Sequence, residues 1–281
     1  MKFTKMHGIG NCYIYINCFE ERVGDAPSVA RAISDRNTGV GSDGLILICP
    51  SQVADARMEM YNLDGSRAQT CGNGIRCLAK YIYDRGLAKK NPLKIETDAG
   101  VLTIDMTIEN GTMKLARVDM GEPGLKPEDL PTTLSPEQMV DHAIRILGHE
   151  AQMTCVSMGN PHAVIYGAPL NIFTPIILAS EGARLENDPM FPERTNVHFV
   201  KVHNPKEITM LIWERGSGPT QACGTGAAAV CVAGVLTDRT EREITAHLPG
   251  GDLQLEWRVD DNHVYLTGPA EEIFTGHWPD N

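Results

Sequence analysis

The strongest constraint on this chain is an internal repeat with a spacing of 152 residues. The hexapeptide at 69–74, Gln-Thr-Cys-Gly-Asn-Gly, aligns with the hexapeptide at 221–226, Gln-Ala-Cys-Gly-Thr-Gly. Each copy follows an apolar stretch that ends in an aromatic residue, Tyr61 in the first copy and Trp213 in the second. A chain of 281 residues is long enough for two domains of about 150 residues each. We therefore expect a duplicated half-molecule.

The distribution of apolar residues predicts mostly strands. Runs of strand length or alternating polarity occur at 13–16, 45–48, 58–61, 94–109, 112–120, 154–158, 163–166, 197–202, 207–213, 253–259 and 263–267. Asn110 and Gly111 predict a tight hairpin turn between two of these strands. A short helix is expected over 28–36.

A further helix is expected after each Cys-Gly-x-Gly. In the first copy, Ile75, Leu78 and Ile82 recur at helical spacing before Gly86, a residue suited to a helix C-terminus. In the second copy, 227–236 is apolar on every side, which predicts a helix buried all round. These patterns predict an α/β fold of the α+β type. It would have two similar halves, each a strand-rich domain wrapped around one central helix.

The segment 121–131 contains three prolines and two glycines. Such a composition favours an irregular connection over a packed element. We therefore place the boundary between the two expected domains in this segment.

Composition excludes several classes of function. A formal net charge of −11, from 25 Lys and Arg against 36 Asp and Glu, opposes binding to phosphate backbones or anionic lipids. We therefore expect no nucleic-acid and no membrane partner. The first residues contain no apolar signal stretch, and the longest apolar run is far shorter than the roughly 18 residues that cross a bilayer. We therefore expect a cytoplasmic protein with reduced cysteines. We also expect no metal site, because none of the eight cysteines has C-x-x-C spacing.

The repeated cysteines carry the chemistry. At the start of a helix, the sulfur of Cys71 or Cys223 lies near unpaired backbone N–H groups and the positive end of the helix dipole, which lowers a thiol pKa. The same helix starts can bind a carboxylate. If the halves pack about a pseudo-twofold axis, the two sulfurs face each other across a cleft. One could then remove a proton from a carbon while the other returns one to the opposite face, which inverts the stereocentre.

Six blocks of residues carry a resemblance to a known family. They are Lys5-Met6-His7-Gly8-x-Gly10-Asn11, Asn62-x-Asp64-Gly65-Ser66, Cys71-Gly72-Asn73-Gly74-x-Arg76-Cys77, Gly159-Asn160-Pro161-His162, Glu193-Arg194-Thr195-Asn196-Val197, and Glu214-Arg215-Gly216-x-Gly218 with Ala222-Cys223-Gly224-Thr225-Gly226. In this order, over nearly the whole chain, they resemble the diaminopimelate epimerase family.

The resemblance implies a cofactor-independent isomerase that interconverts LL- and meso-2,6-diaminopimelate in the synthesis of lysine and peptidoglycan precursors. It also implies a homodimer and two pseudo-symmetric domains, each a strand-rich, barrel-like layer around a central helix. The C-terminal segment is then expected to return to the first domain. The first epimerase domain is then expected at 1–120 together with about 265–281, and the second at 121–264.

The resemblance also assigns residues. Cys71 and Cys223 are the catalytic pair, one acting as thiolate base and the other as thiol acid. The substrate-binding residues are polar groups and helix-start amides, namely Asn11, Asn62, Gly72, Asn73, Asn160, Asn196, Glu214, Arg215, Gly224 and Thr225. Helix-start amides would hold the reacting carboxylate, and the fork of Arg215 suits the distal carboxylate. His162 and Glu214 would tune the two thiols.

Three positions depart from the family pattern. Cys12 stands where Asp is usual, Gly44 stands where some members have Gln, and His198 follows Asn196-Val197 where other residues are common. None of these departures removes an assigned role. Cys77 and Cys231 lie one or two helical turns beyond the catalytic pair and are expected in the core.

Other functions remain open from the residues alone. A racemase of another amino acid could use the same thiol pair. A hydrolase or acyltransferase could use Cys71 or Cys223 as a nucleophile activated by His162, although this leaves the duplication without a purpose. A non-enzymatic anion-binding module could use the helix starts, but it gives Arg215 and the asparagines no role.

Overall fold

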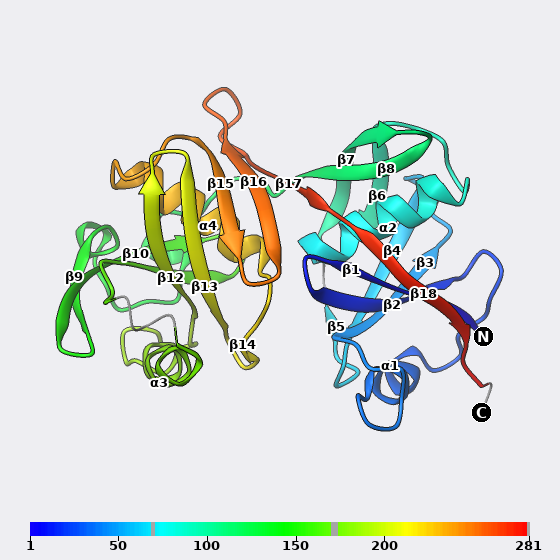
Figure 1. Cartoon of the computed structure of the whole chain (residues 1–281), viewed down its shortest axis with the longest axis horizontal. Coiled ribbons are helices and arrows are strands. Elements are labelled where there is room, and N and C mark those ends of the chain that lie inside the picture. The colour runs from blue at the N-terminus through cyan, green and yellow to red at the C-terminus, as the bar shows by residue number, and fades with distance from the viewer. Residues whose placement is uncertain (69–70, 170–173, 280–281) are drawn as a thin grey trace. The chain divides into compact units, whose positions relative to one another are not determined.

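The fold is taken from a computed structural model, which describes residues 1–68, 71–169 and 174–279. Gln69 of the first repeat copy lies outside the described residues. The chain divides into two compact units: unit 1 comprises Met1–Asp119 and Thr267–Asn281, and unit 2 comprises Met120–Leu266 (Figure 1). Unit 1 is therefore assembled from two separate stretches of chain.

Unit 1 is built from strands and two helices. Its strands are β1 (Lys2–Gly8), β2 (Asn11–Asn17), β3 (Gly44–Cys49), β4 (Ala56–Asn62), β5 (Arg67–Ala68), β6 (Leu93–Thr97), β7 (Gly100–Glu109), β8 (Thr112–Asp119) and β18 (Glu271–His277). Its helices are α1 (Ala26–Ser34) and α2 (Gly72–Asp84).

Unit 2 has a similar composition. Its strands are β9 (His142–Ile146), β10 (His149–Ser157), β11 (Pro161–Tyr166), β12 (Asn196–Asn204), β13 (Glu207–Glu214), β14 (Gly218–Pro219), β15 (Glu243–Leu248) and β16 (Gly251–Trp257). Its helices are α3 (Pro175–Glu186) and α4 (Gly224–Leu236), with short 3-10 turns at Pro127–Asp129 and Pro136–Gln138. Strand β17 (Val264–Pro269) runs on into the returning stretch of unit 1.

The sequence repeat is a repeat of strand pairing. Strand β2 pairs parallel with β3 in unit 1, as β11 does with β12 in unit 2. Strand β4 then pairs antiparallel with β3 and parallel with β6, and β13 pairs in the same two ways with β12 and β15. The helices that follow, α2 and α4, begin 152 residues apart, at Gly72 and Gly224.

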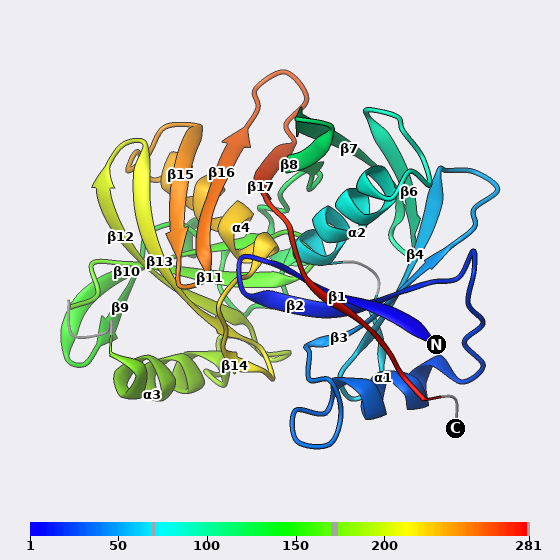
Figure 2. The ribbon, with the colours of Figure 1, turned by 45° about the vertical axis from the view of Figure 1, so that its right-hand side comes forward.

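Helices α2 and α4 are the central elements of their units. In unit 1, α2 contacts β1, β2, β8 and β18 and buries Ile75, Leu78 and Ile82, as their helical spacing predicts. In unit 2, α4 contacts β10, β11, β12, β15 and β16, and its residues from Gly226 to Gly234 are buried. The prediction of a helix buried all round is therefore confirmed up to Gly234, whereas Val235 and Leu236 are only partly buried. Figure 2 shows each helix flanked by the strands of its own unit.

Two predicted segments differ from the structure. The strand predicted over 94–109 is two strands, β6 and β7, because the chain turns at Asp98 and Ala99, where the Thr97 hydroxyl donates to the Gly100 carbonyl (2.8 Å). The hairpin at 110–111 is confirmed, and both of its residues have positive φ. The predicted helix begins and ends two residues earlier than expected, at Ala26 and Ser34.

The segment 121–131 is not a free connection. Gly124 pairs with Ser157 through two backbone hydrogen bonds of 2.9 Å. Leu130 is fully buried and packs in a cluster with Met153 and Phe199. The composition of the segment reflects tight turns, and its apolar side chain anchors it to unit 2. Among the helices of the described residues, none is long and apolar enough to cross a membrane.

Candidate active site

Cys71 occupies the N-cap position of α2. Its backbone is extended (φ −145°, ψ 121°), and its sulfur accepts a hydrogen bond from the N–H of Gly74 at 3.5 Å. The hydroxyl of Tyr13 donates to the same sulfur at 3.6 Å, and the sulfur lies 3.6 Å from the side-chain oxygen of Asn11. Cys71 therefore lies at a helix start, as the sequence predicts.

A polar network orients Asn11 beside Cys71. The Asn11 amide nitrogen donates to the Asp43 carboxylate (2.8 Å), which also accepts the backbone N–H of Cys12 (2.8 Å). The Asn11 oxygen is thereby directed at the sulfur and accepts the side-chain amide of Asn73 at 3.2 Å. Burial raises the pKa of the Cys12 thiol, and the negative Asp43 raises it further. Cys12 is therefore a packed, neutral thiol.

A buried cation lies close to this cluster. Arg76 is fully buried on α2, where its guanidinium donates to the carbonyls of Gly72 (3.1 Å) and Pro269 (3.3 Å). Burial lowers the pKa of Arg76, whereas the sulfurs of Cys77 and Cys71 act in the opposite direction. A positive charge at this place favours a thiolate on α2.

Cys223 occupies the equivalent N-cap of α4 but has a different environment. It is only 5% exposed, and its sulfur lies 3.6 Å from the Thr225 hydroxyl. Burial raises the pKa of Cys223 well above its usual value, and the Glu214 carboxylate raises it further, against the lowering effects of Thr225 and the Gly226 N–H. The expectation of a lowered thiol pKa is therefore wrong for Cys223, because desolvation outweighs the helix start.

His162 and His198 form a buried pair in unit 2, the unit that contains Cys223. His162 Nε2 lies 2.9 Å from the Asn160 oxygen, and His162 Nδ1 lies 2.9 Å from His198 Nε2. Burial lowers the pKa of both rings, to about 3 for His198, so both are neutral. Since an amide oxygen only accepts, His162 carries its proton on Nε2 and accepts from His198.

Asn160 and Thr225 connect His162 with the surroundings of Cys223. The Asn160 amide nitrogen donates to the Thr225 hydroxyl at 3.4 Å, and that hydroxyl is the group beside the Cys223 sulfur. His162 thus reaches Cys223 through Asn160 and Thr225, and among the contacts of the described residues it touches neither the Cys71 nor the Cys223 sulfur directly. Glu214 is the second tuning group expected, and its carboxylate accepts the Thr220 hydroxyl at 2.5 Å.

Arg215 lines a cavity of about 400 Å³ in unit 2, and buried Asn196 contacts the Arg215 backbone. The Asn196 side chain is held by backbone, since it donates to the Pro161 carbonyl (2.8 Å) and accepts the Arg215 N–H (3.0 Å). The Arg215 guanidinium donates to the Glu193 carbonyl at 3.0 Å. Asn196 therefore positions the backbone of Arg215.

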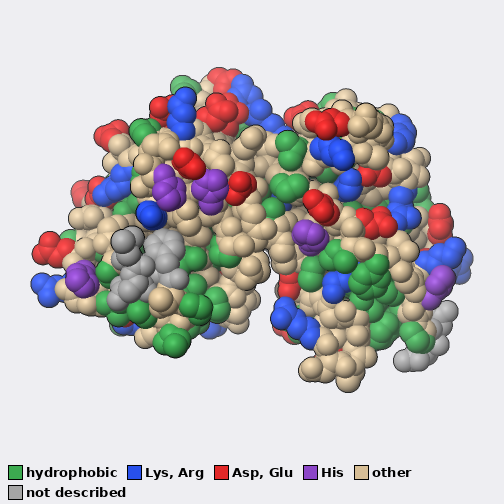
Figure 3. All heavy atoms as spheres, viewed as in Figure 1, with side chains coloured by type: hydrophobic (Ala, Val, Ile, Leu, Met, Phe, Trp, Pro, Cys, Tyr) green, Lys and Arg blue, Asp and Glu red, His purple; other side chains and the backbone are tan. Residues whose placement is uncertain are grey.

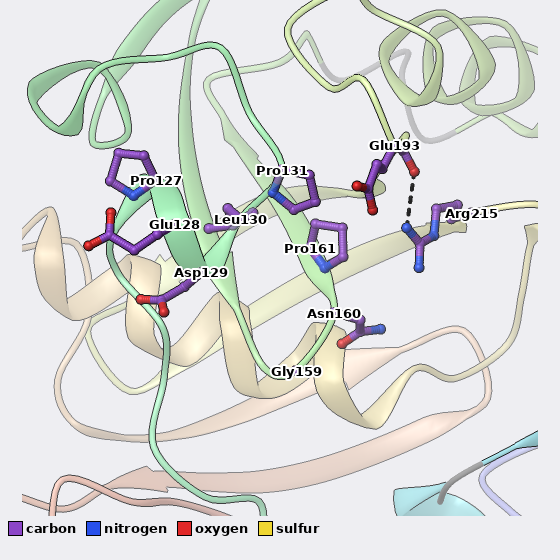
Figure 4. A pocket seen from close by; sticks show the side chains of 10 residues that line it. All are labelled: Pro127, Glu128, Asp129, Leu130, Pro131, Gly159, Asn160, Pro161, Glu193 and Arg215. Carbon is purple, nitrogen blue, oxygen red and sulfur yellow. Dashed lines mark hydrogen bonds between the residues drawn. The ribbon is translucent and has the colours of Figure 1, made fainter.

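The cavity is lined by charges of both signs. In Figure 4, the side chains of Arg215 and Asn160 lie on one side of it, and those of Glu128 and Asp129 lie on the other. A cavity of this kind suits a group that carries a carboxylate and an ammonium together.

The other expected site residues lie at the end of a strand or at the start of a helix. Asn62 ends β4, and its amide donates to the Ser66 hydroxyl (3.0 Å) within a turn. Gly72 and Gly224 are the first residues of α2 and α4 and present helix-start N–H groups. Asn73 and Thr225 are the second residues of these helices.

Sequence reasoning missed three groups that contact the candidate residues. They are Tyr13, Asp43 and, as a partner of His162, His198. The fact that His198 departs from the family pattern was the only signal for any of them. The strand pattern at 13–16 shows burial of Tyr13 but not the neighbour of its hydroxyl.

Comparison with known proteins identifies relatives of the chain. The model of the family described as "Diaminopimelate epimerase" matches residues 3–126 and 154–273. The chain is 51% identical over 276 residues to the diaminopimelate epimerase of Acetivibrio thermocellus, covering 98% of each chain. It is 47% identical over 285 residues to that of Moorella thermoacetica, covering 99% of each.

Solved structures with low sequence identity share the fold. A probable proline racemase from Agrobacterium radiobacter matches with a TM-score of 0.72 at 12% identity, covering 100% of this chain and 93% of that one. A phenazine biosynthesis protein of the PhzF family from Bacillus anthracis matches with a TM-score of 0.66 at 14% identity, covering 98% of each. These likenesses establish the mixed, strand-rich α/β fold.

Proposed function

Since this chain belongs to the diaminopimelate epimerase family, we propose that Cys71 and Cys223 are the acid and base with which it epimerises diaminopimelate. The protein is an isomerase of lysine biosynthesis. In the proposed mechanism, which interconverts the LL- and meso-forms, one sulfur removes the proton from Cα as a thiolate. The other, as a thiol, delivers a proton to the opposite face. No cofactor takes part in this proposal.

The observation that carries the proposal is the equivalent placement of the two sulfurs. Each cysteine is the N-cap of the central helix in its own unit, after strands that pair in the same way. Inversion by two acid-base groups needs one group on each face of the carbon, and the two exchange roles when the direction of reaction reverses. Duplicated thiols meet this need, and a nucleophilic hydrolase would use only one of them.

The environments of the sulfurs suggest which one is charged at rest. Cys223 is buried beside Glu214, which favours the neutral thiol. Cys71 receives the Gly74 N–H and lies near buried Arg76, which favour the thiolate. We propose that Cys71 is the base and Cys223 the acid in the ligand-free protein.

The substrate-binding roles are assigned by pairing each charged group of the substrate with hydrogen-bond donors or opposite charges of the chain. Helix-start N–H groups at Gly72, Asn73, Gly224 and Thr225 would bind the reacting carboxylate and stabilise the negative charge that develops on deprotonation. Arg215 would pair with the distal carboxylate, with Asn160 beside it on the same side of the cavity. Asn11, Asn62, Asn196 and Glu214 complete the proposed set, the last meeting an amine.

We also propose that units 1 and 2 are the two pseudo-symmetric domains of the enzyme, each a barrel-like layer around its helix. These units would correspond to the domains expected from the sequence at 1–120 with about 265–281 and at 121–264. A homodimer is the proposed assembly.

Replacement of either cysteine tests the mechanism. Cys71→Ala and Cys223→Ala should each lower the rate of epimerisation by about 10²–10⁴-fold, since each removes one partner of the proton transfer. The measurement incubates the variants with LL-diaminopimelate in D₂O and follows deuterium at Cα and the appearance of the meso form.

Matched cysteines serve as controls for these variants. Cys49→Ala in unit 1 and Cys155→Ala in unit 2 remove thiols outside the proposed pair and should keep near-normal turnover. Near-normal epimerisation by Cys71→Ala or Cys223→Ala would show that the pair is wrongly assigned.

A further inference from the structure

We propose that Tyr13 is a positioning residue for the reaction, whose hydroxyl donates to the sulfur of Cys71 and so stabilises its thiolate. This inference rests on the proposed role of Cys71 as a base. The two side chains come from β2 and from the start of α2, and the hydroxyl oxygen lies 3.6 Å from the sulfur. Tyr13 is only 6% exposed, so little water competes for this contact.

The surroundings of the sulfur offer a partner for each of its protonation states. A neutral thiol can donate to the Asn11 oxygen, which lies 3.6 Å away and is held in that orientation by Asp43. A thiolate can no longer donate, but it accepts hydrogen bonds from the Tyr13 hydroxyl and the Gly74 N–H. Such a double set of contacts suits a sulfur that alternates between base and acid.

Tyr13 remains a donor throughout the range in which a thiol titrates. Burial raises the pKa of Tyr13 well above its usual value, and the charge on Cys71 and the negative Asp43 raise it further. The other titratable groups around the sulfur are Arg76 and Cys77 on α2 and Tyr15 on β2. Of these, Arg76 is a cation, and it acts in the same direction as the Tyr13 hydroxyl.

The Tyr13 ring packs against the backbone of Gly44. A Cβ at position 44 would lie 3.2 Å from Cε1 of Tyr13 and would overlap the Tyr61 carbonyl. Gly44, one of the departures from the family pattern, is therefore required mainly by the Tyr61 backbone, and it also leaves the Tyr13 ring in its place without a shift. The ring in turn brings the hydroxyl to the sulfur.

Tyr15 provides a matched control for Tyr13. It lies two residues further along β2, is fully buried, and donates its hydroxyl to the Gly74 carbonyl at 3.0 Å instead of to the Cys71 sulfur. Tyr13→Phe and Tyr15→Phe therefore remove the same atom from the same strand. Only the first removes a donor to the sulfur.

The test measures the titration of Cys71 directly. Full-length variants are alkylated with iodoacetamide between about pH 5 and pH 10, a range that brackets the usual thiol pKa, and the modification of Cys71 is quantified by peptide mass spectrometry. In Tyr13→Phe the alkylation midpoint should rise by about one pH unit, the size expected for a lost hydrogen bond to a charged group. The acidic limb of kcat/KM should move the same way. In Tyr15→Phe neither should move.

A second variant covers the case in which Tyr13→Phe does not fold. Incorporation of difluorotyrosine at position 13 makes the hydroxyl a stronger donor and should lower the midpoint instead. If either Tyr13 variant folds, its Cys71 still reacts with iodoacetamide and the alkylation midpoint does not change, the proposed role of Tyr13 is wrong. Full activity of Cys71→Ala would instead overturn the proposed function, so the two failures are distinguishable.

Discussion

Three ionisable residues of unit 2 near the candidate site are kept neutral by burial. Cys223, His162 and His198 are all held neutral by desolvation, although each has a polar neighbour. A neutral His162 can act only by orienting Asn160, because it carries no charge to transmit.

The partly buried His247 behaves in the opposite way. His247 lies between the carboxylates of Asp252 (2.7 Å) and Glu207 (2.9 Å), with the ring of His203 nearby. Figure 3 shows histidine side chains beside acidic ones on this face of unit 2. Hydrogen bonds to Asp252 and Glu207 raise the pKa of His247 above its usual value.

The pH dependence of stability follows from this shift. Because the folded-state pKa is raised, the ion pairs of His247 contribute fully below the unfolded value of about 6.5, and the contribution is lost as pH rises through the folded-state pKa. His247→Gln should therefore lower the free energy of unfolding at pH about 5.5 by no more than about 1 kcal/mol and have less effect at pH about 9. Urea unfolding at both pH values measures this. His149→Gln, at an exposed position of β10, is the control, and an equal loss for His247→Gln at both pH values would contradict the assignment.

The cysteines could be located from sequence, and their neighbours could not. The repeated Cys-Gly-x-Gly is a local signal for a helix start, and both cysteines are N-caps. Tyr13, Asp43 and the Cys71 sulfur, by contrast, meet only after β2, the turn before β3 and α2 pack together. The high pKa of Cys223 likewise depends on burial, which the motif does not encode.

At the scale of elements, the two central helices differ in what surrounds their second glycine. A Cβ at Gly74 in α2 would meet the ends of flexible side chains, Ile46 Cδ1 at 2.7 Å and Met58 Cε at 3.2 Å. A Cβ at the equivalent Gly226 in α4 would overlap the buried ring of His198, 2.6 Å from Nε2, and would lie 3.2 Å from the Cys223 sulfur.

This difference predicts unequal tolerance of the same substitution. Gly226→Ala should destabilise the protein by about 1–3 kcal/mol, because overpacking against a hydrogen-bonded ring outweighs the gain of up to about 1 kcal/mol from replacing glycine in a helix. Gly74→Ala should cost less, since the Ile46 and Met58 side chains can shift. Urea unfolding of the two variants gives the comparison. A larger loss for Gly74→Ala would show that the His198 ring moves freely.

Elements with strong apolar patterns were predictable, and those that depend on a partner were not. Helix α4 and strand β3 are apolar and buried along their lengths. Strand β18 is almost entirely exposed and shows no inward face, yet it pairs with β1 along its whole length. Its backbone hydrogen bonds, which leave no trace in the residue pattern, define it as a strand.

At the scale of the whole molecule, the two-thiol proposal requires one sulfur from each unit to reach a single carbon. Diamide should then oxidise the pair to a disulfide, as two electrons and two protons pass from the thiols to the diazene, which becomes a hydrazine. We expect loss of activity, a Cys71 to Cys223 cross-link in the peptide mass spectrum, and recovery with a thiol reductant. Cys71→Ser cannot form the link and is the control. Inactivation without this cross-link would contradict the pairing.

The discontinuity of unit 1 has a consequence for biosynthesis. The strand that completes its sheet, β18, is translated after all of unit 2. During synthesis, unit 2 can close around Cys223 while the sheet around Cys71 still lacks its last strand and exposes the edge of β1. A ribosome-bound intermediate would thus carry a finished half and an unfinished half, and chaperones that cover open sheet edges would act on the half that was made first.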